Sequence, residues 1–252
     1  MIRLVASDMD GTLLGKNGAI SERTAEVVHQ LQARDVDFLV CTGRGYLDAK
    51  LPLEKAGILC DMICMNGAAI YDKFGRQIYK KPLKKEQLLQ ILEFCEGRPV
   101  VLDFMTDKGS CTISGEEEMR QAFHEGYLLP MAAVESFEHL KQRFSFTKKE
   151  DLFRHGNTVY KMSIMSRDPE TLSAVRRELY ENVDDLAVVS SDATNLEITH
   201  IEAQKGTALI HYAFYRGIGL HEIMALGDSE NDHSMLSLQL GYTLSMENGA
   251  DI

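Results

Sequence analysis

Short apolar runs and amphipathic segments alternate along residues 1–80. The apolar runs at residues 4–7, 36–41 and 62–65 predict three buried strands. Ser21 can cap a helix whose apolar residues share one face, and residues 47–55 predict a second helix that ends near Gly57. This order of strand, helix, strand, helix and strand predicts a parallel sheet with right-handed crossovers.

A different pattern begins after a small hairpin that residues 68–71 and 77–79 predict, and Pro82 marks the change. The elements predicted beyond it are helices at 84–96 and 169–180 and strands near 100–105, 111–114, 160–165, 187–190 and 196–199. These elements do not follow a strand–helix–strand order. The region between the strands near 111–114 and 160–165 contains mixed segments that predict no single kind of element. Residues 83–198 therefore predict an inserted α+β cap domain.

The strand–helix rhythm resumes at Lys205. The predicted elements are a helix at 206–215, a strand at 221–226, a short helix at 234–239 and a last strand at 242–244. Residues 1–82 and 199–252 together predict one α/β core, a Rossmann-like parallel sheet that the cap domain interrupts.

Composition limits the classes of protein that this chain can belong to. The net charge of -11 argues against a nucleic-acid-binding surface, which needs a basic stripe. No apolar run approaches the length that spans a membrane. The 5 cysteines form no CxxC pair, which favours reduced thiols and a cytoplasmic location.

Two carboxylates, Asp8 and Asp10, follow the first predicted strand and are expected to leave the strand end on the same side. A carboxylate at a buried strand end is costly unless it is paired or bound to a metal. The segment that continues through Leu13 is also typical of an ordinary turn. An EF-hand is excluded because the segment has no third alternating acid and no closing Glu.

Three further polar segments lie where an anion or a cation could bind. Thr42-Gly43-Arg44 follows the second strand and offers a hydroxyl, a backbone amide and a guanidinium. Lys205-Gly206 opens a helix, where an ammonium group and the helix N-terminus favour a phosphate. Residues 227–232 carry two acids and an Asn, which suit a hard cation. Each segment alone is also typical of a plain loop, but ligands of open α/β sheets bind beyond the carboxyl ends of the strands, where these segments converge.

The set Asp8-x-Asp10-Gly-Thr-Leu, Thr42-Gly-Arg, Lys205-Gly and Gly227-Asp-x-x-Asn-Asp232 resembles the motifs of the haloacid dehalogenase superfamily. The insertion between the second and third motifs, with Asn66-Gly67-Ala68 after the third strand, is similar to the Cof-type subfamily with a C2 cap. The resemblance covers nearly the whole chain. It implies a Mg²⁺-dependent phosphatase that hydrolyses small phosphorylated metabolites such as sugar phosphates.

The resemblance also implies a role for each motif residue. Asp8 would attack the phosphate and form an aspartyl-phosphate, while Asp10 would protonate the leaving alcohol and then deprotonate water. Mg²⁺ would be held by Asp8, the backbone carbonyl of Asp10 and Asp228. Asp232 would support the waters of the metal or orient Lys205.

The phosphate and the rest of the substrate would have further ligands. The expected phosphate ligands are Thr42, Gly43, Lys205 and Asn231. Arg44 could pair with the substrate or only brace its loop, and Asn66 is a further candidate for substrate contact. In the cap domain, Asn195 is a candidate for the same role.

Two other functions are compatible with these motifs, namely a sugar phosphomutase of the same superfamily and a catalytically idle binding or regulatory module. Family members usually continue past the segment that matches residues 246–250, with another strand and a closing helix. The resemblance therefore implies an exposed sheet edge here, and either lower stability or a homodimer is expected.

Overall fold

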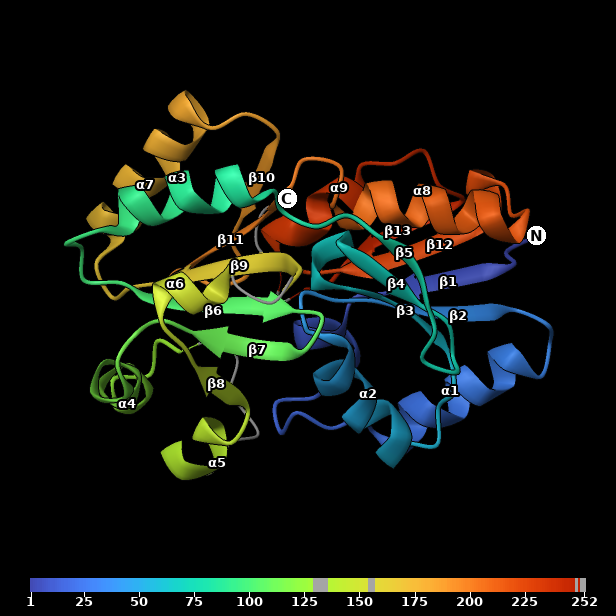
Figure 1. Cartoon of the computed structure of the whole chain (residues 1–252). Coiled ribbons are helices and arrows are strands. Elements are labelled where there is room, and N and C mark those ends of the chain that lie inside the picture. The colour runs from blue at the N-terminus through green and yellow to red at the C-terminus, as the bar shows by residue number, and fades with distance from the viewer. Residues whose placement is uncertain (129–135, 154–156, 248, 250–252) are drawn as a thin grey trace. The chain divides into compact units, whose positions relative to one another are not determined.

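The structure is a computed structural model, and it describes residues 1–128, 136–153, 157–247 and 249. Part of the segment 246–250 thus lies outside the described residues. The chain divides into two compact units (Figure 1). Met1–Lys81 and Glu202–Ile252 form the first, here called the core unit, and Pro82–Ile201 form the second, the cap unit.

The core unit is built on a seven-stranded sheet in the order β13-β12-β1-β2-β3-β4-β5. Its strands are β1 (Leu4–Ser7), β2 (Asp37–Cys41), β3 (Asp61–Cys64), β4 (Ala69–Tyr71), β5 (Gln77–Lys80), β12 (Ile223–Gly227) and β13 (Tyr242–Ser245). The strands from β13 to β3 are parallel, whereas β4 and β5 pair antiparallel. The predicted parallel α/β core is confirmed, although β12 begins two residues later than predicted because Leu220–Glu222 form a helical turn.

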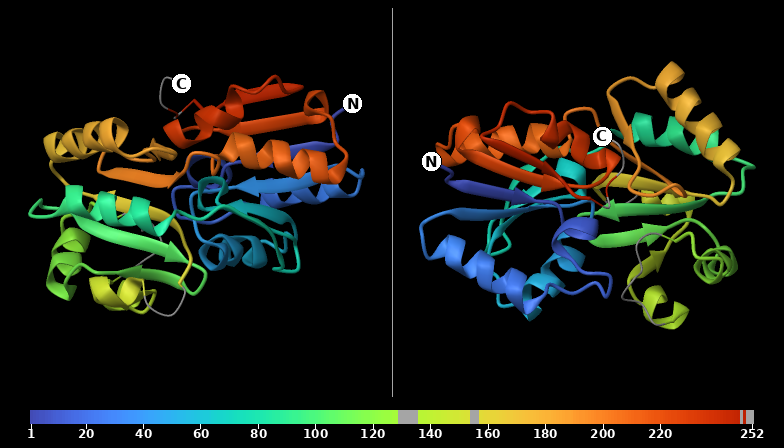
Figure 2. Two further views of the ribbon diagram at one scale, coloured as in Figure 1. Left: turned by 45° about the horizontal axis from the view of Figure 1, so that its top comes forward. Right: turned by 180° about the vertical axis from the view of Figure 1, so that it is seen from behind.

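Helices cover both faces of the core sheet, with α1 and α2 on one face and α8 on the other (Figures 1 and 2). They are α1 (Glu22–Gln32), α2 (Tyr46–Lys55), α8 (Lys205–Arg216) and the one-turn α9 (His233–Leu236). The Ser21 hydroxyl caps α1 by accepting a hydrogen bond from the Thr24 amide at 3.1 Å, as the sequence predicts. Among the described residues, no helix has the length and apolarity that crossing a bilayer requires.

The cap unit is a six-stranded sheet in the order β10-β11-β9-β6-β7-β8. Its strands are β6 (Val101–Thr106), β7 (Gly109–Thr112), β8 (Phe144–Phe146), β9 (Val159–Met165), β10 (Leu186–Val189) and β11 (Asn195–His200). Its helices are α3 (Lys85–Cys95), α4 (Glu116–His124), α5 (Phe137–Lys141), α6 (Lys149–Leu152) and α7 (Pro169–Asn182). The prediction of mixed α+β structure holds, and α4, α5, α6 and β8 fill the stretch in which the sequence gives no clear pattern.

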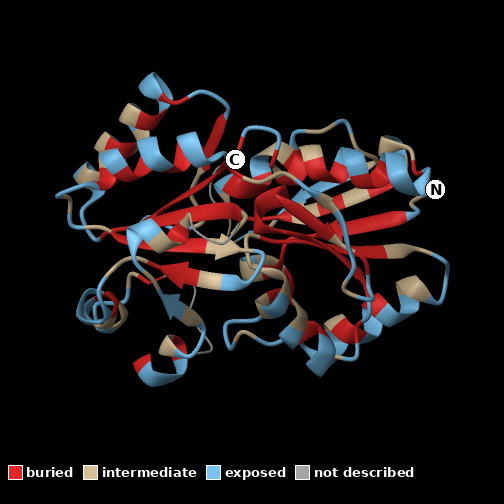
Figure 3. Ribbon diagram, in the orientation of Figure 1, coloured by how far each residue is buried: buried red, intermediate tan, exposed pale blue. Residues whose placement is uncertain are grey.

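Each unit has its own buried core (Figure 3). In the cap unit, Ile91 of α3 and Val175 of α7 pack with Met162 and Ile164 of β9 in one apolar cluster. In the core unit, Leu4 of β1 belongs to a second cluster with residues of β2, β3 and α8. Because β1, β2 and β12 are parallel, the loops that follow them emerge at one edge of the core sheet. This edge carries the polar motifs.

Candidate active site

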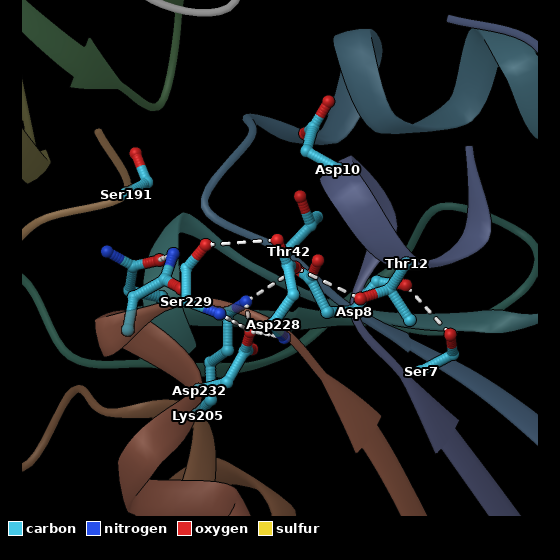
Figure 4. Close-up of polar contacts among 12 residues, drawn as sticks. Ser7, Asp8, Asp10, Thr12, Thr42, Ser191, Lys205, Asp228, Ser229 and Asp232 are labelled. Atoms are coloured by element: carbon cyan, nitrogen blue, oxygen red, sulfur yellow. Dashed lines mark hydrogen bonds and ion pairs between the residues drawn. The ribbon is translucent and has the colours of Figure 1, made fainter. Parts of the chain in front are cut away.

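Lys205 is the centre of a buried ion cluster at this edge (Figure 4). Its ammonium group donates hydrogen bonds to Asp8 Oδ1 at 2.6 Å and to Asp232 Oδ1 at 2.7 Å. The side chains of Lys205 and Asp232 are fully buried, and that of Asp8 is 6% exposed. Two carboxyl groups face one ammonium group, so the cluster carries a surplus negative charge, which water does not screen, only while both carboxyl groups are ionised.

Burial and charge shift the proton affinities of this cluster. Burial is the main cause that raises the pKa of Asp8; the Lys205 ammonium lowers it and the Asp232 charge raises it further. Burial alone would lower the pKa of Lys205, but the charges of Asp232 and Asp8 raise it above its ordinary value. Lys205 is therefore a permanent cation, and a second cation beside Asp8 would favour the ionised carboxylate.

Asp232 organises the loop that follows β12. Its Oδ2 accepts hydrogen bonds from the amides of Asp228 at 2.9 Å and Ser229 at 3.1 Å. Gly227 makes this possible, since a Cβ there would lie 2.5 Å from Asp232 Cγ. With Oδ1 on Lys205 and Oδ2 on the two amides, both oxygens of Asp232 are engaged.

Asp228 lies beside this loop with its carboxylate facing the segment after β1. Its Oδ1 accepts a hydrogen bond from the Thr12 hydroxyl at 3.0 Å, and its Oδ2 accepts one from the Ser229 hydroxyl at 3.3 Å. Gly11 has a φ of +78°, and a Cβ there would lie 2.2 Å from Asp228 Oδ2. Only glycine fits this left-handed position next to the carboxylate.

Thr42 and Arg44 lie in the loop after β2, which is fastened to the turn after β3. The Asn66 amide donates to the Thr42 carbonyl at 3.0 Å, and the Met65 amide donates to the Arg44 carbonyl at 2.9 Å. The buried Thr42 hydroxyl accepts a hydrogen bond from the Arg44 amide at 3.1 Å. Because this hydroxyl acts as acceptor here, its own hydrogen can be donated to an anion.

Asp10 has a different partner from Asp8. Its carboxylate binds the Arg44 guanidinium, with Nε–Oδ2 at 2.7 Å and Nη2–Oδ1 at 2.5 Å. Figure 4 shows Asp10 pointing away from the pair of Asp8 and Lys205. Residues Met9–Leu13 turn directly after β1, so that the Asp8 and Asp10 carboxylates contact different cations in this structure. In this structure the Arg44 guanidinium contacts Asp10 in the segment after β1, and its pairing with the substrate stays a prediction.

Comparison with known proteins identifies the family of this chain. A family model described as haloacid dehalogenase-like hydrolase matches residues 5–252. The chain belongs to this family. The phosphatase YwpJ of Bacillus subtilis is 30% identical and is aligned over 93% of this chain and 86% of its own length. An HMP-PP phosphatase of Serratia proteamaculans is 29% identical over 98% of this chain and 85% of its own length.

A solved structure agrees with the fold of this hydrolase. A haloacid dehalogenase-like hydrolase from B. subtilis has a TM-score of 0.86 at 29% identity, covering 99% of this chain and 91% of that one. The predicted family, fold class and enzyme class, a phosphoric monoester hydrolase, are confirmed by these matches.

The hydrolase contains a buried acidic group that can hold a divalent metal. Asp8, Asp228 and Asp232 each offer a carboxylate oxygen, and these oxygens lie within 4.8 Å of one another. Carboxylate oxygens suit hard divalent cations. The Asp10 side chain is not part of this group, and its predicted contribution is the backbone carbonyl. Asp232 is held by the Lys205 ammonium and two backbone amides, whereas Asp228 accepts hydrogen bonds only from two hydroxyl groups, which can turn away. Asp228 is therefore better placed than Asp232 to serve with Asp8 as a ligand.

Asn66 and Asn231 meet beside the loop that follows β12. The Asn231 Nδ2 donates to Asn66 Oδ1 at 3.3 Å, and Asn66 has a φ of +57°. The Asn231 Oδ1 is buried and has no hydrogen-bond partner among the described residues. An orphaned buried acceptor fits a water held by a metal, or a protonated phosphate oxygen. Asn66 thus positions Asn231 in this structure.

Asn195 belongs to the cap unit and shapes its own loop. Its Oδ1 accepts hydrogen bonds from the Ser191 amide at 3.1 Å and the Asp192 amide at 3.3 Å. Its Nδ2 donates to Ser191 Oγ at 2.9 Å, and the residue is 1% exposed. This amide therefore holds residues of the cap loop together.

Sequence reasoning did not find the side chains that orient Asp228. Thr12 and Ser229 both lie within the motifs, but only their distances to the Asp228 carboxylate distinguish them from neighbouring loop residues. Gly43 lies between Thr42 and Arg44, as predicted, and its role as an amide donor to phosphate stays a prediction.

Gly11→Ala is expected to lower kcat by about 100-fold, because the new methyl group displaces the Asp228 carboxylate. The matched control is Gly97→Ala, where φ is +72° and no atom lies within 4 Å of the new Cβ. Both variants should lose about 1–2 kcal/mol from backbone strain, while only the first loses hydrolysis. Equal activity of the two variants, measured at equal folded concentration, would contradict the role given to Asp228.

Proposed function

We propose that this hydrolase is a Mg²⁺-dependent phosphatase that acts through an aspartyl-phosphate on Asp8. The observation that supports this most is the buried cluster in which Lys205 lies between Asp8 and Asp232, with Asp228 alongside. A nucleophilic carboxylate, a permanent cation and a metal-binding acid are the groups that transfer of a phosphoryl group requires. Asp232 fixes both the lysine and the loop that carries Asp228.

The reaction would take place in two displacements. In the first, a carboxylate oxygen of Asp8 bonds to phosphorus, the ester P–O bond breaks, and the leaving oxygen takes a proton from Asp10. In the second, water gives a proton to Asp10 and its oxygen bonds to phosphorus, while the Asp8–phosphorus bond breaks. Asp8 regains its carboxylate, Asp10 regains its proton, and phosphate and alcohol are the products.

The remaining groups would neutralise the phosphate charge. Asp8, the Asp10 backbone carbonyl and Asp228 would hold Mg²⁺, which supplies positive charge to the phosphate oxygens. Lys205 and the Thr42 hydroxyl would bind two of these oxygens, and the Gly43 amide a further one. Asn231 would accept a hydrogen bond from a phosphate oxygen or from a water of the metal.

We propose small phosphorylated metabolites, including sugar phosphates, as the substrates. Two relatives carry names of this kind, the HMP-PP phosphatase of S. proteamaculans and a 5-amino-6-(5-phospho-D-ribitylamino)uracil phosphatase of B. subtilis. The second is 28% identical over 99% of this chain and 89% of its own length. These names favour hydrolysis over phosphomutase activity or an idle binding role.

Metal dependence is the experiment that tests this proposal. Phosphate release from an aryl phosphate is expected with Mg²⁺ and is expected to stop with a chelator. Without substrate, Mg²⁺ at about 100 times its Kd should stabilise the fold by about 2.7 kcal/mol, seen as a higher melting temperature. The control is Asp228→Asn, which should lose both responses. Activity that is unaffected by the chelator would contradict the proposed metal site.

We also propose a cytoplasmic location and a homodimer. The 5 cysteines are all free and buried, as expected in a reducing compartment. Edge strand β13 is exposed along its whole length, and an open strand edge can pair with a second copy. Light scattering at several protein concentrations tests the dimer, and a monomer at every concentration would contradict it.

A further inference from the structure

We propose that Arg44 is a positioning residue for Asp10: it fixes the carboxylate that exchanges the proton with the leaving group, and it does not bind phosphate. This inference rests on the proposed phosphatase function. It assigns Arg44 to the acid–base step rather than to substrate binding, so that a change at Arg44 should affect only those substrates whose leaving group needs a proton.

The contact between the two side chains is bidentate. Arg44 Nε donates to one oxygen of Asp10 at 2.7 Å and Nη2 donates to the other at 2.5 Å. Two parallel hydrogen bonds fix both the position and the plane of a carboxylate, which a single bond does not. Each Asp10 oxygen keeps a further lone pair, and one of these can carry the proton that goes to the leaving group and is later regained from the water.

Arg44 itself is held firmly at its backbone. Its amide donates to Thr42 Oγ1 at 3.1 Å, and its carbonyl accepts from the Met65 amide at 2.9 Å. Met65 and Asn66 have φ values of +52° and +57°, so the turn that receives this loop is itself unusual. The guanidinium therefore extends from a fixed base toward the segment after β1. One loop then carries both the Thr42 hydroxyl and the brace of Asp10.

Asp10 needs such a brace because of where it lies. Its side chain is 37% exposed, whereas that of Asp8 is 6% exposed and is held by Lys205. Lys205 is engaged with Asp8 and Asp232. Within the described part of the chain, Arg44 is the one cation in ion-pair contact with Asp10. A half-exposed carboxylate without this partner would sample several rotamers.

The charge around Arg44 favours this role over phosphate binding. Burial alone would lower the pKa of Arg44, but its hydrogen bond to Asp10 and the charges of Asp10, Asp48 and Asp8 raise it. The guanidinium stays charged and lies among acids that compete with an incoming anion. Two of its donors are already taken by Asp10.

The test compares two esters with the intact protein. We expect Arg44→Ala to lower kcat/KM for an alkyl phosphate by about 10–100-fold, because an alkoxide leaving group needs a well-placed acid. For p-nitrophenyl phosphate the loss should stay within about threefold, because a nitrophenolate leaves without a proton. Arg44→Lys should recover only part of the alkyl activity, since lysine cannot form the bidentate contact.

A double-mutant cycle separates the brace from direct substrate binding. If Arg44 acts through Asp10, Arg44→Ala should cost nothing further when Asp10→Asn is already present. Arg76→Ala is the control: Arg76 also pairs with an Asp, Asp72, but in the turn between β4 and β5. Arg76→Ala should leave kcat/KM unchanged for both esters.

Two other outcomes would refute different parts of this account. An equal loss of kcat/KM for both esters, or losses from Arg44 and Asp10 that multiply, would overturn the inference and make Arg44 a substrate ligand. Absence of metal-dependent hydrolysis of either ester by the unchanged protein would instead refute the proposed function. The two failures are thus distinguishable.

Discussion

Asp8→Asn is expected to lower kcat for phosphate release by at least about four orders of magnitude, because the amide cannot form the covalent bond to phosphorus. Asn has nearly the volume of Asp, so the surrounding structure should persist. The amide oxygen of the substituted side chain can still accept the hydrogen bond that Lys205 donates to Asp8 Oδ1 at 2.6 Å. Steady-state assays on an aryl phosphate with Mg²⁺ measure the loss.

Asp72→Asn is the matched control for this variant. Asp72 is also buried, but it accepts hydrogen bonds from the Phe74 and Arg76 amides in the turn between β4 and β5. It should retain full activity per folded molecule. An Asp8→Asn protein that keeps a tenth of the wild-type kcat would refute the covalent role of Asp8.

Lys205→Met is expected to lower the free energy of unfolding by about 3–5 kcal/mol, because it leaves Asp8 and Asp232 buried without their cation. It should also lower kcat by about 100–1000-fold, since the ammonium no longer stabilises charge on the transferred phosphoryl group. Chemical denaturation measures the first effect and steady-state kinetics the second. At a pH well above the raised pKa of Asp8, Mg²⁺ should stabilise this variant more than it stabilises the wild type, because the ionised Asp8 carboxylate then lacks its Lys205 partner.

Lys161→Met in the cap unit tests whether the changed stabilisation by Mg²⁺ is specific to the loss of Lys205. Lys161 is also buried and pairs with Glu197 at 2.9 Å. Its loss should destabilise the protein in a similar way while leaving the stabilisation by Mg²⁺ unchanged. If Mg²⁺ stabilised both variants equally, the metal would not bind beside Lys205.

Periodicity in the sequence predicts the core unit well, for identifiable physical reasons. β1, β2 and β3 are short runs buried on both faces, as in parallel sheets covered by helices on either side. Ser21 and Gly57 mark helix boundaries by chemistry that is local to the chain. Such signals need no knowledge of distant contacts.

Parts of the cap unit could not be predicted in this way. β8 has three residues and α6 has four. Such elements are too short to show the alternation of apolar residues typical of a strand or the 3.6-residue period typical of a helix. α4 carries three consecutive Glu residues in its first turn and only two buried side chains, so its apolar face is narrow. These elements depend on packing with distant parts of the cap unit.

The candidate site shows a similar limit. Motif spacing locates Asp8, Asp228 and Lys205 because each follows a strand or opens a helix at the same sheet edge. Spacing alone does not tell which acid each cation meets: the family resemblance implies that Asp232 can orient Lys205, but the pairing of Arg44 with Asp10 depends on side-chain direction. The sequence therefore identifies the groups, and the structure adds the cation that each acid contacts.

The stereochemical course at phosphorus tests the central claim most directly. A phosphate monoester made chiral with oxygen isotopes would be transferred to an acceptor alcohol, such as a diol, and the product configuration determined. Two successive in-line displacements through Asp8 predict retention of configuration. Inversion would mean that the acceptor attacks phosphorus directly, and it would contradict an aspartyl-phosphate on Asp8.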